Sequence, residues 1–243
     1  MLKRALAAAL FFASATANEG YAQQVVSALD EPAGRGVQQR CAEAPVDVTA
    51  ASPMERHLAC DAAGQALRRL ERCNISSRTP LRIEILGEVR RPSGGTIFGG
   101  FDPVRESVLV TRYENVAPLA AGTPFGLLPQ DEFYKSLIFH EVVHAVMHQN
   151  HKRPPANHAA CEYPAYALQI ESLPRDLREK FLQAFDVGAD KNGFRFSDAI
   201  LAFDPFFFAA RAYEHFAASA DGCAQLHALI EGEVAFIWTR SSR

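Results

Sequence analysis

The spacing of apolar and polar residues predicts strands early in the chain. Residues 81–89 (LRIEILGEV) alternate between apolar and polar side chains, which is typical of a half-buried strand. Residues 96–112 (TIFGGFDPVRESVLVTR) indicate two strands joined around Asp102 and Pro103. Between the N-terminus and these strands, apolar residues recur at helical spacing, which predicts a helix over 53–72.

Helical spacing dominates the chain beyond Leu128. The expected helices cover 130–149, 158–172, 174–186, 197–218 with a kink at Pro205, and 221–231. Strands followed by helices predict an α+β fold, with a small N-terminal antiparallel sheet and a mostly helical C-terminal part. A doubly wound parallel sheet would instead require the two kinds of element to alternate.

The N-terminus has the features of a secretory signal peptide over residues 1–22. Lys3 and Arg4 precede a short apolar stretch, and small residues follow with cleavage expected after Ala17 or Ala22. That stretch is too short to span a bilayer, and no later one is long and apolar enough. We therefore expect an exported protein, periplasmic or extracellular, without stable membrane insertion.

The remaining chain divides into an arm and one domain. Residues 23–52 are rich in Pro, Gly and Ala and show no sustained period, which predicts an irregular arm. The whole chain is 48% hydrophobic, so we expect 53–243 to form a single domain around one core. A formal net charge of -3 without a basic cluster argues against nucleic acid binding.

Export makes the five cysteines candidates for disulfides, and their odd number leaves at least one unpaired within the chain. Cys60 and Cys73 cannot pair if one helix carries both, since their separation rises about 20 Å and a disulfide needs Cα atoms within about 7 Å. Each must find Cys41, Cys161 or Cys223, or stay free. The sequence does not choose among these pairings.

Candidate chemistry lies in FHEVVHAVMHQN, residues 139–150. Histidines four apart on a helix point to one locus, so His140 and His144 can share Zn²⁺ with nitrogens about 2.0–2.1 Å from it. Glu141 can reach a water there as general base. This His-Glu-x-x-His pattern is the zincin signature; the alternative is a set of hydrogen-bonded core residues.

A catalytic zinc site needs a third protein ligand. The metzincin pattern is excluded, because Met147 and Asn150 stand where it places glycine and histidine. If the next helix begins near residue 157 and returns antiparallel, Glu162 ends level with His144, while Glu171 overshoots by about 13 Å. Pro164 either kinks this helix or begins it, and in the second case Glu162 sits at the cap.

At these residues the chain resembles a gluzincin, and is especially similar to small exported bacterial proteins with HEVVHAVMHQ before CEYPAYALQIESLP. The resemblance covers about residues 55–232 and implies a zinc-dependent peptidase with a zincin-like fold. It implies His140, His144 and Glu162 as ligands and Glu141 as general base. The oligomeric state stays open.

The resemblance also implies a downstream histidine or tyrosine that stabilises the oxyanion, for which His215 and Tyr213 in RAYEHF are the candidates. The alternative for both is a solvent-facing residue or a buried hydrogen bond. His148, His151 and His158 are expected to be solvated rather than ligands.

Two further segments have alternative interpretations. Residues 106–112 (ESVLVTR) predict either a sheet edge that pairs with an extended substrate or an ordinary core strand. Cys161, beside Glu162, competes for zinc as a thiolate or forms a disulfide or buried thiol.

These features predict a zinc-dependent hydrolase, a metallopeptidase acting on a peptide or protein substrate. Within enzymes, a non-peptide amide hydrolase fits the same motif. The first alternative is an exported non-catalytic binding or structural module in which zinc braces two helices. A metal-free interaction domain is the other.

Overall fold

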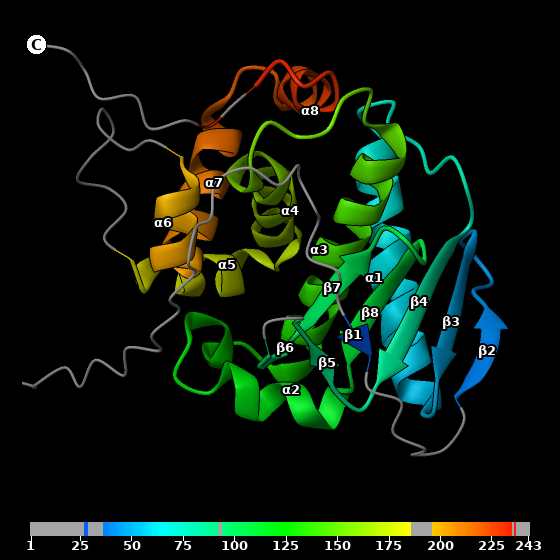
Figure 1. Ribbon diagram of the computed structural model, residues 1–243. Helices are drawn as coiled ribbons and strands as arrows, with labels where there is room; N and C mark the ends of the chain where they lie inside the picture. The colour runs from blue at the N-terminus through cyan, green and yellow to red at the C-terminus, as the bar shows by residue number, and fades with distance from the viewer. Residues whose placement is uncertain (1–26, 29–35, 92–93, 186–195, 235, 237–243) are drawn as a thin grey trace, which may run out of the picture.

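A five-stranded mixed sheet forms one side of the protein (Figure 1). The computed structural model describes residues 27–28, 36–91, 94–185, 196–234 and 236. In spatial order the strands are β2 (Val37–Arg40), β3 (Val46–Ala50), β4 (Leu81–Leu86), β8 (Ser107–Thr111) and β7 (Gly99–Asp102). Strands β3, β4 and β8 are parallel, while β2 and β7 pair antiparallel at the two edges. A second small sheet contains β1 (Ser27–Ala28), β5 (Val89–Arg90) and β6 (Thr96–Ile97).

The fold is α+β, as expected, but the prediction of an antiparallel sheet is wrong. A helix connects β3 to β4, and such a crossover returns the chain in the same direction and so makes neighbouring strands parallel. The antiparallel hairpin predicted around Asp102 and Pro103 is present as β7 and β8.

The prediction of an irregular arm over 23–52 is wrong for residues 37–40 and 46–50, which form β2 and β3. In β3 the side chains of Val46, Val48 and Ala50 are buried while those between them are partly exposed, the period of a strand. The five residues VDVTA carry this period, but the stretch is short and preceded by proline and alanine. The predicted signal peptide, residues 1–22, lies outside the described residues.

Helix α1 (Pro53–Glu71) begins with proline at its first turn, where a missing N–H breaks no helical bond. Alanine is the commonest residue on its buried face, at positions Ala59, Ala62, Ala63 and Ala66. Small side chains allow close approach, and α1 packs against both β3 and the helix α3 (Gln130–Asn150).

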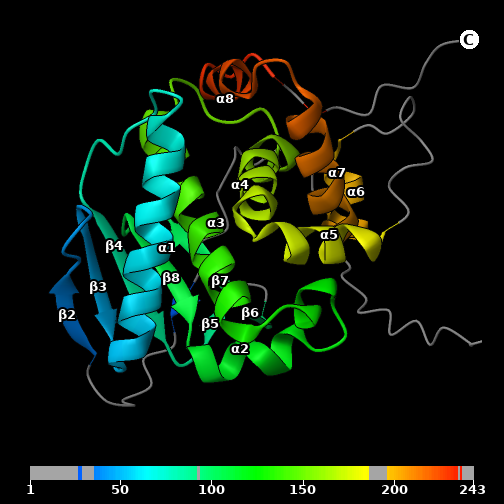
Figure 2. The same cartoon turned by 180° about the vertical axis from the view of Figure 1, so that it is seen from behind.

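Helix α3 is the centre of the molecule. It contacts α1 on one side, β7 and β8 of the sheet on another, and the helix α4 (His158–Ser172) on a third (Figure 2). Most of its residues are buried, so its polar side chains are held in an apolar surrounding.

The C-terminal part is helical, as predicted. Its further helices are α5 (Arg175–Gln183), α6 (Asp198–Phe203), α7 (Pro205–Ala218) and α8 (Gly222–Ile230). The expected helix 197–218 is two helices, because Asp204 ends α6 and caps α7 by accepting hydrogen bonds from the N–H groups of Phe206 and Phe207. The pattern missed the eight-residue helix α2 (Tyr113–Ala120), which precedes the 3-10 turn η1 (Pro124–Leu127). Within the described part of the chain, no helix is long and apolar enough to cross a membrane.

Two disulfides link distant parts of the fold. Cys41 pairs with Cys60, and Cys73 pairs with Cys223 across 150 residues of sequence. Cys161 is a free cysteine. Cys60 and Cys73 take separate partners, as expected from their positions along α1 and just beyond its end.

Removing the longer disulfide should cost more stability than removing the shorter one. In the chain-entropy model, closing 150 residues stabilises by about 5 kcal/mol. Closing 19 residues stabilises by about 3 kcal/mol. Urea titrations of Cys73→Ala/Cys223→Ala and of Cys41→Ala/Cys60→Ala measure this difference in the free energy of unfolding. Equal losses would contradict the entropic explanation.

Candidate metal centre

Two histidine rings from α3 converge, with 3.0 Å between the Nε2 atoms of His140 and His144. The two residues stand one helical turn apart, so their side chains leave the same face of the helix. His140 is buried and His144 is partly buried. The apolar residues around them on α3 fix where the rings lie.

Helix α4 brings Glu162 to the same point. Asn157 caps the helix by accepting a hydrogen bond from the Ala160 N–H, so α4 begins at His158 and continues through Pro164. One carboxylate oxygen of Glu162 lies 3.4 Å from His140 Nε2, and the other lies 3.4 Å from His144 Nε2. Glu162 is therefore five residues into α4 and not at its cap.

Among the described residues, His140, His144 and Glu162 form the one group of histidine, cysteine or acidic side chains suited to a metal ion, with ligand atoms within 4.8 Å of one another. Ligands about 2.0–2.1 Å from a tetrahedral zinc ion stand about 3.3–3.4 Å apart. The observed separations of 3.0 and 3.4 Å are close to this. The spacing of these donor atoms therefore suits a metal ion with tetrahedral coordination.

A chain of outer hydrogen bonds directs the Nε2 lone pair of His140 into the site. Ser136 donates to the Phe133 carbonyl and accepts from the Gln169 amide, so Gln169 Oε1 is left to accept from His140 Nδ1 at 2.9 Å. His144 Nδ1 lies 3.7 Å from Cys161 Sγ. With Nδ1 of His140 engaged as a donor, the lone pair of its Nε2 atom faces Glu162 and His144, where a bound cation would accept it.

Replacing Gln169 with leucine should weaken zinc binding by about 10- to 100-fold, because His140 would lose the acceptor that fixes its tautomer and ring orientation. Competition with a chromophoric chelator measures the affinity. Gln183→Leu, at an exposed position on α5, is the matched control and should bind zinc as the wild type does. Wild-type affinity in Gln169→Leu would show that the hydrogen bond does not orient the ligand.

The electrostatics of the cluster keep the carboxylate ionised. Burial alone would raise the pKa of Glu162, but charge on His144 and hydrogen bonds from the surrounding histidines hold it well below its ordinary value. Burial would lower the pKa of His144, yet the nearby Glu162 carboxylate and Cys161 raise it well above the usual range. An ionised carboxylate is the form that binds a metal.

Glu141 lies beside the cluster, against the edge of the sheet. Burial raises the pKa of its carboxyl group. A Cβ atom at Gly99 in β7 would stand 3.4 Å from the Glu141 side chain and 2.8 Å from the Leu109 carbonyl oxygen, so only glycine fits there. The edge strand beside Glu141 is β7, since β8 lies between β4 and β7 and is buried throughout. The interpretation of residues 106–112 as a sheet edge is therefore wrong.

His215 does not join the cluster among the described residues. Its Nδ1 lies 2.7 Å from the Tyr163 hydroxyl and 3.3 Å from the Gln225 amide nitrogen, and its ring packs against Phe196. Burial lowers the pKa of His215. Tyr213 stacks under the Arg178 guanidinium. The contacts of His215 and Tyr213 given above are therefore with residues other than the three candidate ligands.

His158 contacts the candidate ligand set. Its Nε2 lies 3.2 Å from a Glu162 oxygen, one helical turn away on α4, although nearly half of its side chain is exposed. It steadies the carboxylate rather than sharing the converging point of the other three residues. His148 instead packs its ring against Phe101.

Three residues near the cluster were missed by the sequence reasoning. Gln169 and Tyr166 stand seven and four positions after Glu162, hence on the same face of α4, and helical spacing could have found both. The Tyr166 ring packs edge-on against His140, with 4.6 Å between ring centroids. Gly99 carries no such signal, because its proximity to Glu141 comes from packing between α3 and β7.

A model of the family of unknown function DUF6639 matches residues 46–239. The chain belongs to this family. No curated protein and no solved structure matches it. The matched span includes α3, α4 and all the residues of the cluster, so the candidate metal centre lies inside the part that defines the family.

Proposed function

We propose that this protein is a zinc-dependent hydrolase that cleaves peptide bonds, with a zincin-like arrangement of α3 and α4. One observation carries the proposal: two imidazole nitrogens and one carboxylate converge at zinc-ligand separations, and a second carboxylate lies next to them. Three protein ligands leave a fourth position for water or substrate, as in catalytic rather than structural zinc sites.

His140, His144 and Glu162 would hold the metal, and Glu141 would move protons. Zinc, when bound, supplies a Lewis acid and lowers the pKa of water toward about 7. Glu141 takes a proton from the attacking water as the new C–O bond forms, and then delivers it to the departing amine as the C–N bond breaks. Its burial suits this exchange, because a raised carboxyl pKa lies nearer to the working pH.

The edge strand β7 offers a place for an extended peptide. In the described part of the chain it has a sheet neighbour only on the β8 side, so its outer backbone groups can pair with a further strand. Glycines at 99 and 100 keep side chains off the strand where Glu141 approaches it. A substrate paired there would run past the base and the candidate ligands.

The test is hydrolysis of a quenched fluorescent peptide library by the purified protein supplied with zinc. We expect cleavage that 1,10-phenanthroline abolishes and added zinc restores. Zinc that binds without any cleavage would favour the alternative, an exported module in which zinc braces α3 to α4. Absence of both zinc binding and cleavage would contradict the proposal.

Export belongs to the same proposal. The two disulfides support it, because disulfides form and persist in the periplasm or outside the cell. Cys161 is a free cysteine, partly buried and with its Sγ atom 3.7 Å from His144 Nδ1.

A further inference from the structure

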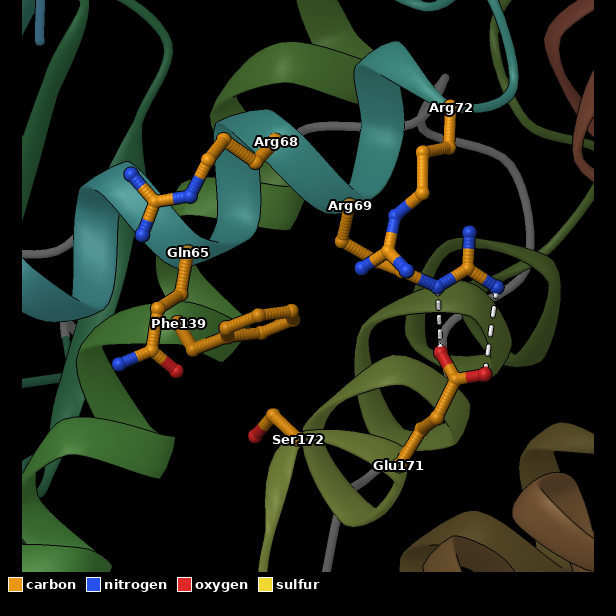
Figure 3. Close-up of a pocket in the computed structure, with 7 residues that line it drawn as sticks. All are labelled: Gln65, Arg68, Arg69, Arg72, Phe139, Glu171 and Ser172. Atoms are coloured by element: carbon orange, nitrogen blue, oxygen red, sulfur yellow. Dashed lines mark hydrogen bonds and ion pairs between the residues drawn. The ribbon is translucent and has the colours of Figure 1, made fainter.

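A pocket lies between α1, α3 and the end of α4, apart from the candidate metal centre. Its cavity measures about 360 Å³. The lining residues are Gln65, Arg68, Arg69, Arg72, Phe139, Glu171 and Ser172 (Figure 3). None of the candidate zinc ligands lines it, so any ligand there is separate from the hydrolytic site.

One arginine of the pocket is already neutralised. Arg69 donates from Nε and Nη2 to the two oxygens of Glu171, at 2.6 and 3.3 Å, in the forked geometry shown in Figure 3. This ion pair joins α1 to α4 and forms one wall. The pocket therefore has three guanidinium groups and one carboxylate, in a chain whose formal net charge is -3.

The other two arginines, Arg68 and Arg72, are exposed. Within the described residues no hydrogen-bond or ion-pair partner is found for either guanidinium. They stand four positions apart on one helix, where like charges repel and destabilise. Positive charge near the C-terminal end of α1 interacts favourably with the helix dipole, which is one reason for arginines there. The dipole does not explain why these arginines line a cavity.

A glycine in the middle of α1 gives Arg68 room. A Cβ atom at Gly64 would stand 3.1 Å from Arg68 Nη1, so this guanidinium lies folded back along the helix. Glycine inside a helix costs about 0.5–1 kcal/mol relative to alanine. Figure 3 shows Arg68 extending toward Gln65, while Arg69 and Arg72 extend toward Glu171.

The remaining lining residues fit an organic molecule with an acidic group. The Phe139 side chain, which is 3% exposed, forms a small apolar floor, and Gln65 and Ser172 add hydrogen-bonding groups. A cavity of this volume is within the range of small-molecule sites and is larger than an inorganic anion needs. Guanidinium forks match the oxygens of carboxylates and phosphates.

We propose that this pocket binds a small organic anion, with Arg68 at one end of the pocket and Arg72 at the other as the exposed cations that attract its carboxylate or phosphate group. The proposal is independent of zinc and of peptide hydrolysis. It assigns a binding role to a face of α1 that the candidate metal centre does not use.

Isothermal titration calorimetry of the purified protein with benzoate, phenyl phosphate and uncharged benzyl alcohol tests the proposal. We expect saturable binding of at least one anion and none of the alcohol, and the preferred anion distinguishes a carboxylate ligand from a phosphate ligand. Absence of saturable binding of both anions at millimolar concentrations would overturn the proposal. Equal binding of benzyl alcohol would do the same.

Variants show whether the arginines hold the anion. Arg68→Gln/Arg72→Gln should weaken binding by about tenfold or more, because the charge-assisted hydrogen bonds are lost. Arg82→Gln/Arg105→Gln removes the same charge from exposed positions elsewhere and should bind as the wild type does. Arg68→Lys/Arg72→Lys keeps the charge without the fork and should lose less affinity. Unchanged binding in the glutamine variant, or equal loss in the control, would refute the site.

Discussion

Glu141→Gln should lower peptide turnover by about 10²- to 10⁴-fold while the zinc content stays at the wild-type level. Glutamine has nearly the same shape, so the packing of this buried side chain against Gly99 is kept. An amide cannot take a proton from water, and Glu141 is not one of the three converging ligands. The measurements are kcat/KM on a peptide selected from the library and zinc per chain by elemental mass spectrometry.

Glu132→Gln is the matched control for this prediction. It makes the same chemical change on the same helix, two turns before the cluster, where Glu132 pairs with Lys135. Its turnover and zinc content should match those of the wild type. Retained turnover in Glu141→Gln would refute the role of Glu141 as the base. Loss of zinc from this variant would show that the substitution impairs metal binding instead of proton transfer.

The geometry of the candidate cluster was predictable because two consecutive helices build it. Helical spacing alone puts His140 and His144 on one face, and matching the rise of the two helices selects Glu162 over Glu171. In the structure, Glu171 pairs with Arg69 on the side of α4 opposite to Glu162. Pro164 did not shift the start of the helix, because Asn157 caps it earlier.

The sheet was less predictable, since its pairings join residues far apart in the sequence. Strand β3 pairs with β4, although helix α1 separates them in the sequence. The local pattern of VDVTA does not indicate which strand lies beside it. The edge position of β7 follows from the order of all five strands, so 106–112 could not be recognised as central from its own residues. The contacts of His215 likewise depend on how α7 meets α4.

Measuring the zinc content of the purified protein distinguishes a metal site from a chance arrangement of these side chains. Purified protein supplied with zinc should hold about one zinc per chain, and His144→Ala and Glu162→Ala should each reduce this to near zero. Each substitution removes one of three ligands and leaves too few to complete a tetrahedral site. The loss should be larger than in Gln169→Leu, which disturbs a ligand without removing it.

His151→Ala is the control for the zinc measurement, because it also removes a histidine from the chain near the end of α3. Burial lowers the pKa of His151 to about 4, so that imidazole is neutral and could bind zinc if it were close enough. Its zinc content should equal that of the wild type, since His151 is not among the converging residues. Zinc retained in Glu162→Ala would point to a different third ligand, and His158, 3.2 Å from Glu162, would be the first to replace. Zinc absent from the wild type would instead make the convergence a feature of core packing, in which Glu162 is held by its three histidine neighbours alone.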